Sequence, residues 1–226
     1  MKPLTLAAAR AHARVSRRMA RRLLLYILGM NVMAAGIVLS TRAGLGVAAI
    51  SSAAYAWSQF LGISFGTANI LLYAVFISAE ALLLRAFPPS LLLQIPMALF
   101  AGLSIDLFDF LLPAGPDRFA AQLPCLLLAN VTTGIGVYGM TKADLILDPG
   151  NAVVATLCTV LRKPFSYLRI RFDVSLVLFT AASGLLIAGR IVGIGLGTVI
   201  SAWLIGRSVG AAAHAADASL DRWLRA

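Results

Sequence analysis

Long apolar segments separated by short polar connections constrain the fold of this chain more than any other feature. A membrane core of about 30 Å is crossed by about 20 residues of α-helix. Hydrophobic residues make up 60% of the 226 positions and charged residues only 12%, which excludes an ordinary soluble domain. We therefore predict an all-α polytopic membrane protein with about six transmembrane helices, near residues 22–41, 66–86, 91–112, 121–141, 172–189 and 191–210.

Two further apolar segments, residues 47–61 and 149–161, are too short to cross a membrane comfortably. At about 1.5 Å per residue, each would reach only about 20 Å as a helix. Such segments are typical of re-entrant or broken helices, which are tolerated where protein buries them or where they line a cavity. If both did cross, the chain would have eight spans and its two ends would still lie on one side. We predict six.

The basic residues are distributed unevenly along the chain, whose formal charge is +10. Arginines crowd before the first predicted span, and further basic residues follow the second, fourth and sixth spans. The opposite side holds only Arg42, Arg118 and Arg190. By the positive-inside rule, this asymmetry predicts that both termini lie in the cytoplasm. Membrane topology and anionic lipid explain the arginines, so nucleic acid is not an expected partner.

The predicted membrane domain, residues 22–210, divides into two similar halves, residues 22–112 and 113–210. AAGIVLSTRAGLG at 34–46 parallels TTGIGVYGMTKADL at 132–145, and a short apolar segment and a long helix follow each. Three crossings per half would place the halves in opposite orientation. Inverted repeats with short interrupted helices are the architecture of many transporters, whose sites lie at the repeat interface.

Two polar tails flank this domain, residues 1–21 and residues 211–226. Arginines at helical spacing in the first tail are compatible with a basic helix on the membrane surface. A solvated, frayed tail fits the same residues equally well, and both interpretations stay open here. We expect the second tail to be cytoplasmic.

Several motifs resemble those of one bacterial membrane protein family, and they extend over residues 22–210. They are STRAGLG, GISFGTANILL and LLLQIPMALFAGLSIDLF in the first half, and TKADLILDPGN, RIRFD and GIGLGTVISAWLIG in the second. In these motifs the chain resembles the YczE/YyaS/YitT family. The resemblance implies a polytopic inner-membrane protein of a transporter-like kind, but it brings no substrate and no site residues. Val47-Ala48 stands where that family usually carries Gly-Pro or a similar pair, so no proline kink is expected there.

Polar and ionisable side chains inside membrane segments are costly, which makes each a candidate for function. An offset of 104 residues between the halves places Asn69 opposite Asp173, and Gln94 opposite Thr198. Helix–helix hydrogen bonding would also explain the neutral amides. The residues that we predict to line a solute or ion pathway are Arg42, Asn69, Gln94, Asp106 and Asp173.

Each charged member of this set also has a plainer interpretation. Asp106 and Asp109 share a helix face and could take a cation or relay a proton, or they could simply meet water at the interface. Arg42 would flank the outer mouth of the pathway, or serve as an interfacial anchor. Asp173 follows Arg169, an inner-side anchor, at i+4 and could be only its ion-pair partner.

A second group of candidates lies nearer the predicted interfaces. We expect Glu80 to extend toward water near Arg85, and Asp148 to cap the helix that starts at Pro149. The secondary candidates for the pathway are Glu80, Asp109, Lys142, Asp144 and Asn151.

No sequence pattern indicates catalysis or a cofactor. The chain has no P-loop, no HExxH and no nucleophile–base arrangement, and Cys125 and Cys158 match no metal or redox spacing. We expect no enzyme, no metal and no cofactor. Pairs of glycines at GxxxG spacing, such as Gly193/Gly197, indicate close helix packing or association with a second copy or a partner membrane protein.

The resulting hypothesis is a small secondary transporter or permease of unknown solute in the lipid bilayer. One alternative is a substrate-binding membrane subunit that works with a separate ATPase module. Another is a membrane regulator that transports nothing.

Overall fold

The computed structural model describes residues 6–225, with side chains from 17 to 224, and these residues form eight helices and no strand. Six helices are long and apolar enough to cross a membrane, which confirms the predicted helical fold with about six spans. Two helices of 13 residues separate them, where the short apolar segments were predicted. The helices are α1 Leu6–Ala43, α2 Ala49–Leu61, α3 Phe65–Leu84, α4 Pro89–Leu111, α5 Phe119–Ala143, α6 Pro149–Leu161, α7 Phe165–Ala188 and α8 Leu196–Arg225.

The fifth span begins earlier than the sequence suggested. Helix α7 starts at Phe165, after Pro164 in an extended conformation, and not near residue 172. The charged run RIRFD therefore lies inside the helix. Arg169 and Asp173 bond each other across one helical turn, which lets both enter the span as a pair. The predicted i,i+4 ion pair between Arg169 and Asp173 is confirmed.

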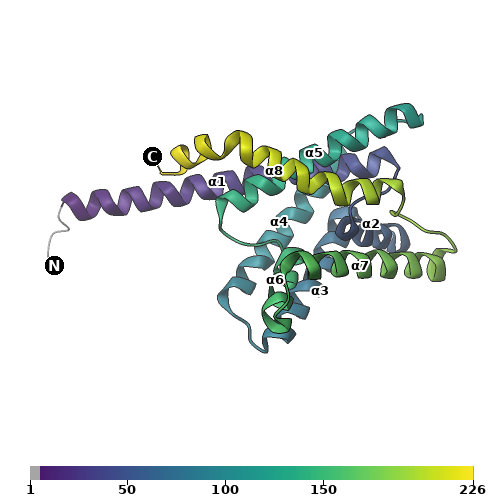
Figure 1. The fold of residues 1–226 in the computed structure, drawn as a ribbon, viewed down its shortest axis with the longest axis horizontal. Helices are drawn as coiled ribbons and strands as arrows, with labels where there is room; N and C mark the ends of the chain where they lie inside the picture. Colours follow the sequence, from purple (N-terminus) through teal and green to yellow (C-terminus); the bar gives the residue numbers. More distant parts are fainter. Residues whose placement is uncertain (1–5, 226) are drawn as a thin grey trace.

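The two polar tails continue the spans at the ends of the chain. Helix α1 runs unbroken from Leu6, so the described part of the basic tail is neither a separate surface helix nor frayed. Helix α8 likewise continues to Arg225. The two extensions lie side by side in Figure 1, where Arg21 Nη1 donates a hydrogen bond to the Trp223 carbonyl at 2.7 Å. Residues 1–5 of the predicted tail lie outside the described residues.

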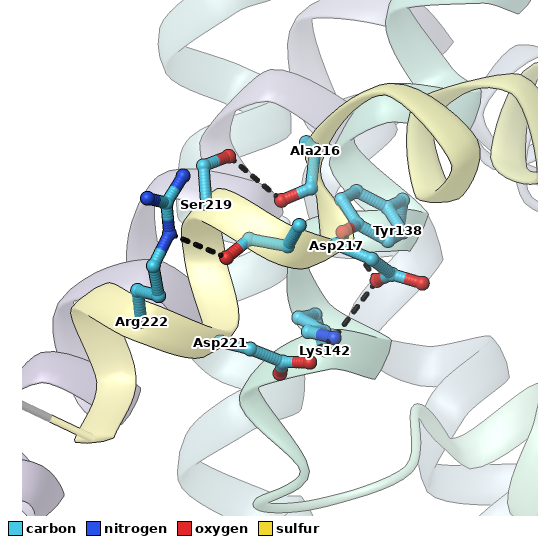
Figure 2. A network of polar contacts seen from close by, with 8 residues as sticks. Tyr138, Lys142, Ala216, Asp217, Ser219, Asp221 and Arg222 are labelled. Carbon is cyan, nitrogen blue, oxygen red and sulfur yellow. Dashed lines mark hydrogen bonds and ion pairs between the residues drawn. The ribbon is translucent and has the colours of Figure 1, made fainter.

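Lys142, at the end of α5, fastens the extension of α8 to the bundle. Its ammonium group lies 2.8 Å from carboxylate oxygens of both Asp217 and Asp221. Tyr138, one turn earlier on α5, donates its hydroxyl to Asp217 at 2.7 Å. Figure 2 shows these side chains meeting between the two helices. Lys142 therefore has a structural role here, as the ion-pair partner of both Asp217 and Asp221.

Helices α1 and α5 make the most extensive helix contact within the described residues, and glycines let them approach closely. A side chain on Gly36 would overlap the backbone of Thr133, and a side chain on Gly136 would overlap the backbone of Met33. As α1 advances, its contacts move backward along α5, so the two helices are antiparallel. Small residues let helix backbones approach closely where packing rather than water drives association.

The short helices indicate how the two halves correspond. Helix α2 starts at Ala49 and α6 at Pro149, and the following helices start at Phe65 and Phe165, an offset of 100 residues. Helix α2 packs on α7, and α6 packs on α3. The predicted offset of 104 differs from the offset of these helix starts: at 100 residues, Asn69 aligns with Arg169, and Tyr73 with Asp173.

Candidate functional site

A chain of four polar side chains joins the start of α6 to α7. Asn151 donates to the carboxylate of Asp148, and Arg169 donates to the side-chain carbonyl of Asn151. The Nε of Arg169 lies 3.0 Å from the Asp173 carboxylate. The Arg169 guanidinium group thus connects α6 to α7 and lies near the carboxylates of both Asp148 and Asp173. We call these residues, together with Tyr26, Asn69 and Tyr73, the polar centre.

Helices α1 and α3 supply the rest of the polar centre. Asn69 is 3% exposed, and Tyr26 and Tyr73 are each 4% exposed. Both tyrosine hydroxyls lie within electrostatic range of Asp148, and Arg169 is within the same range of Tyr73. Side chains from α1, α3, α6 and α7, drawn from both halves of the sequence, therefore converge on one place.

Three buried polar atoms at the polar centre have no hydrogen-bond partner. They are the Tyr26 hydroxyl, the Asn69 side-chain nitrogen, which lies near the Tyr73 hydroxyl without meeting the geometry of a hydrogen bond, and the Asp173 Oδ1. Buried polar groups in native proteins almost always have partners, and each exception calls for an explanation. The atoms left open here are an amide donor, a carboxylate acceptor and a hydroxyl that can do either. A small ligand with both donors and acceptors would satisfy them.

Opposing influences act on the pKa of the Asp148 carboxyl. Burial raises the pKa of its carboxyl, while the Arg169 charge and the hydrogen bond from Asn151 act in the opposite direction. The residue stands at the N-cap position of α6, but its side chain makes no capping hydrogen bond. The predicted helix start is confirmed, with Asp148 as the N-cap residue and Pro149 directly after it, and the Asn151 side chain donates to the carboxylate.

A second buried cluster lies at the contact of α3, α4 and α6. The Nε2 of Gln94 donates to Glu80 at 2.9 Å, and the Thr156 hydroxyl donates to its other oxygen at 3.2 Å. Glu80 is 7% exposed. We expected this side chain to extend toward water near Arg85, and that expectation is wrong, because Glu80 points between helices. Residues Glu80, Gln94 and Thr156 are called the Glu80 cluster below.

Asp106 of α4 accepts hydrogen bonds at the start of α3. Its two carboxylate oxygens accept hydrogen bonds from the Gly66 backbone nitrogen at 2.6 Å and from the Ser64 hydroxyl at 2.7 Å. A carboxylate at a helix N-terminus is stabilised by the free backbone N–H groups and the helix dipole. Asp106 therefore ties α4 to α3, and neither of its oxygens is left without a partner.

We predict that Asp106→Ala will lower the free energy of unfolding by about 2 kcal/mol, because it removes two charge-assisted hydrogen bonds at a helix end. Asp109→Ala is the matched control, since that residue is three positions away and its side chain is 42% exposed in its ion pair. Such exposed pairs contribute about 0.5 kcal/mol. Thermal unfolding in detergent measures both, and equal losses would contradict the assignment.

The remaining candidates lie away from the polar centre. Arg42 bonds the Asp109 carboxylate at 2.9 Å and the Asp109 carbonyl at 2.6 Å, which joins the ends of α1 and α4. The Asp144 side chain is 84% exposed and lies 3.9 Å from Arg22. The structure thus brings Asn69, Asn151 and Asp173 together, pairs Gln94 with Glu80, and separates these two groups from Arg42, Asp106, Asp109, Lys142 and Asp144.

A cavity of about 310 Å³ lies beside the turn that follows α1. Ser40, Thr41, Tyr55, Gln59 and Arg190 give it a polar lining. Ser40 and Val47 are shared with a smaller void that Asn130, Ser51 and Thr133 also line. The Ser40 hydroxyl and the Asn130 side-chain nitrogen are buried without partners. Polar surface thus extends from the cavity into the bundle.

The glycine-rich turn before α8 closes one wall of this cavity. Val47 donates its backbone N–H to the Gly193 carbonyl at 3.0 Å, and Gly197 donates to the Leu45 carbonyl at 2.7 Å. A side chain on Gly195 would approach the Leu45 carbonyl oxygen to 2.5 Å. The glycines of GIGLG therefore allow the two connecting turns to pack backbone against backbone.

Comparison with known proteins finds one family model and one bacterial membrane protein that are similar to the chain. A model of a family described as "Family of unknown function (DUF6198)" matches residues 20–214. The uncharacterized membrane protein YczE of Bacillus subtilis (strain 168) is 26% identical over 183 residues, which cover 80% of each chain. The resemblance inferred from the sequence motifs is thereby confirmed. No solved structure matches the chain.

Proposed function

The chain belongs to the family of unknown function DUF6198, and on that premise we propose that it is a gradient-driven transporter of a small polar solute. It is a multi-pass membrane protein, so its environment is the lipid bilayer. Transport, rather than catalysis, is the activity that we assign to the polar centre. We place the protein in the bacterial inner membrane with both termini in the cytoplasm.

The observation that carries the proposal is the set of buried atoms without partners at the polar centre. Asp173 Oδ1 can accept hydrogen bonds from an ammonium group, while the Asn69 amide and the Tyr26 hydroxyl can donate to a carboxylate. A small zwitterion, such as an amino acid, carries both groups. Arg169 stands beside both carboxylates and keeps the site from being strongly anionic. We therefore propose a zwitterionic solute.

The relationship between the two halves supports alternating access. Gly36 contacts Thr133, and Gly136 contacts Met33. Adding 100 to the first residue of one contact and subtracting 100 from its second gives the other contact, so the two contacts are reciprocal. Reciprocal contacts between antiparallel α1 and α5 are what an inverted repeat requires. In transporters of that architecture, solute sites lie near the repeat interface. The polar centre takes side chains from both halves, as that architecture would require.

The two halves are also packed differently. Helix α3 packs extensively on α4, whereas their counterparts α7 and α8 make few contacts with each other. The polar cavity lies beside the α7–α8 turn, on the side where that pair is open. Exchange of these two packings between the halves would move the opening from one membrane face to the other. We propose this exchange as the transport movement.

Flux through the purified protein tests the proposal. In liposomes with an imposed proton gradient and no ATP, we expect uptake of at least one radiolabelled member of a panel of zwitterionic amino acids. We expect no uptake of neutral sugars under the same conditions. Asn69→Leu should abolish the amino-acid uptake, because it removes an open donor without removing a charge. Asn31→Leu is the matched control, since Asn31 bonds only the Ile27 carbonyl of its own helix.

The alternatives predict different results. A substrate-binding subunit would bind a solute but move it only after an ATPase module had co-purified with it. A membrane regulator would neither bind nor move any member of the panel. Uptake that is equal in the wild type and in Asn69→Leu would contradict the assigned site even if transport occurs.

A further inference from the structure

Glu80 is a buried carboxylate that has hydrogen bonds but no cation. Gln94 donates to one carboxylate oxygen at 2.9 Å and Thr156 to the other at 3.2 Å. The ion pairs formed by residues 17–224 do not include Glu80. A carboxylate inside a membrane segment is costly unless it is paired, and such residues mark ion paths and proton relays. Hydrogen bonds alone support this charge.

The helices that pack around Glu80 place no basic side chain beside its carboxylate within the described residues. Helix α3 packs against α2, α4 and α6. Tyr73 is the only other titratable residue of α3 itself, and α2 carries only Tyr55. The acids of α4, Asp106 and Asp109, lie at its other end, beside the start of α3 and the end of α1. Helix α6 has no charged residue within it, only Cys158, while charges stand at its two ends and at the end of α3, at Asp148, Arg162, Lys163 and Arg85.

Gln94 of α4 can form a hydrogen bond with Glu80 whether the carboxyl group is ionised or protonated. Gln94 is 3% exposed, and its Oε1 is buried without a partner, although its Nε2 is used. A carboxylate needs a donor, and Nε2 provides it. A protonated carboxyl needs an acceptor for its own hydrogen, and Oε1 becomes that acceptor when the amide turns over. The open oxygen of Gln94 is therefore an acceptor that a protonated carboxyl group at Glu80 can use.

We propose that Glu80 is a reversible proton-binding site and that the proton is the ion whose gradient drives transport. One proton moves from water to a carboxylate oxygen of Glu80, which neutralises its charge, and the same proton returns to water on release. Glu80 lies four residues before Leu84, where α3 ends, so the water at that end of the bundle is the nearest source. The driving role rests on the proposed function, whereas the protonation itself does not.

The same pair of helices joins the proton site to the polar centre. On α3, Asn69 and Tyr73 belong to the polar centre, and Glu80 follows two turns after Tyr73 on the buried face. On α6, Asn151 bonds Arg169 while Thr156 bonds Glu80. A shift of α6 that accompanies solute binding would therefore change the hydrogen bond on Glu80. This provides a direct mechanical route between solute and proton.

Infrared difference spectroscopy of the purified protein tests protonation without any solute. Stepping the buffer from alkaline to acidic produces a C=O band from every carboxylate that takes up a proton, and one of these bands should be absent in Glu80→Gln. Asp109→Asn is the matched control and should keep the band, because Asp109 is an exposed carboxylate far from the cluster. In Gln94→Met the band should remain but shift in frequency, since the amide partner is lost. This second variant also assigns the band if Glu80→Gln does not fold.

Two outcomes would overturn the proposal. One is a set of carboxyl bands that is the same in the wild type and in Glu80→Gln, and the other is a set that Gln94→Met leaves unchanged. The driving role is tested separately in liposomes: Glu80→Gln should lose uptake against a concentration gradient but keep exchange of labelled for unlabelled amino acid. A normal band together with no transport by the wild type would contradict the proposed function and leave the proton site standing. Uptake against the gradient that survives in Glu80→Gln would contradict the coupling.

Discussion

Gly136→Ala should be among the most damaging single substitutions in this protein. Gly136 packs against the α1 backbone at Met33, and a Cβ atom there would overlap backbone atoms that cannot move independently. Relief requires α1 and α5 to separate along the contact on which the bundle is built. We expect a loss of about 3 kcal/mol or more in the free energy of unfolding, the upper range for overpacking in a core. The half-buried thiols of Cys125 and Cys158 give the measurement, through dye labelling during heating.

Gly206→Ala provides the control for the glycine prediction. Gly206 also lies within a long helix, but a Cβ atom there would meet nothing within 4 Å. Because alanine favours a helix over glycine by about 1 kcal/mol, this variant should be as stable as the wild type or more so. If Gly136→Ala and Gly206→Ala unfolded at the same temperature, the α1–α5 contact would not be the tight one described.

Arg169→Ala should have the largest effect at the polar centre. The substitution removes the one guanidinium group between Asp148 and Asp173 and leaves two largely buried carboxylates without a cation. Removing one partner of a buried ion pair costs about 3–5 kcal/mol, and the partial exposure of this pair favours the lower figure. Arg169→Lys should recover only part of the loss, since an ammonium group cannot bond Asn151 and Asp173 in the same fork. Thermal unfolding and amino-acid uptake report the two consequences.

The stability of Arg169→Ala should also depend on pH in a defined direction. Without the guanidinium, burial raises the pKa of Asp148 with less opposition than in the wild type. A carboxyl with a raised pKa in the folded state destabilises the fold as the pH rises, because unfolding then lets it ionise. The variant should therefore regain stability as the pH falls. A deficit that stays constant over acidic and neutral pH would contradict this account.

Arg171→Ala is the matched control for Arg169. It lies two residues along the same helix, but its guanidinium rests 3.5 Å from the centre of the Tyr167 ring on the exposed face. Such an exposed contact contributes about 0.5–1 kcal/mol. We expect near-normal stability and full uptake. If both arginine variants behaved alike, basic charge near the end of α7 would explain the effect, and the specific bonds of Arg169 would not.

The helical membrane fold was predictable because it follows from length and hydropathy. The short helices α2 and α6 were also located correctly, since their apolar segments are too short to span. The start of α7 was not located correctly, because a charged run such as RIRFD normally marks the end of a span. Here Arg169 and Asp173 satisfy each other one turn apart, and Asn151 of another helix takes a further donor. That third partner is a tertiary contact, which no local pattern reveals.

The candidate site was predictable only in part. Polarity alone selected Asn69, Asn151 and Asp173, because uncompensated polar groups are rare in membrane segments. It missed Tyr26 and Tyr73, since tyrosines in apolar segments are common and carry no signal of their own. It also assigned Asp106 to the pathway, although the partner of that carboxylate is the Gly66 backbone, 40 residues earlier in the chain. At the offset of 100 residues that the helix starts share, Asn69 aligns with Arg169, and this alignment would have drawn attention to the arginine.

Access to the polar centre from the two faces of the membrane tests the central claim most directly. The substitution Tyr73→Cys, in a chain whose Cys125 and Cys158 are replaced by serine, puts one thiol in the polar centre, at a position that is 4% exposed, and leaves the three open polar atoms in place. The account predicts that a membrane-impermeant maleimide reaches this thiol in both right-side-out and inside-out vesicles, and that a transported amino acid slows labelling from either side. Labelling from one face only, or from neither, would contradict an alternating-access transporter.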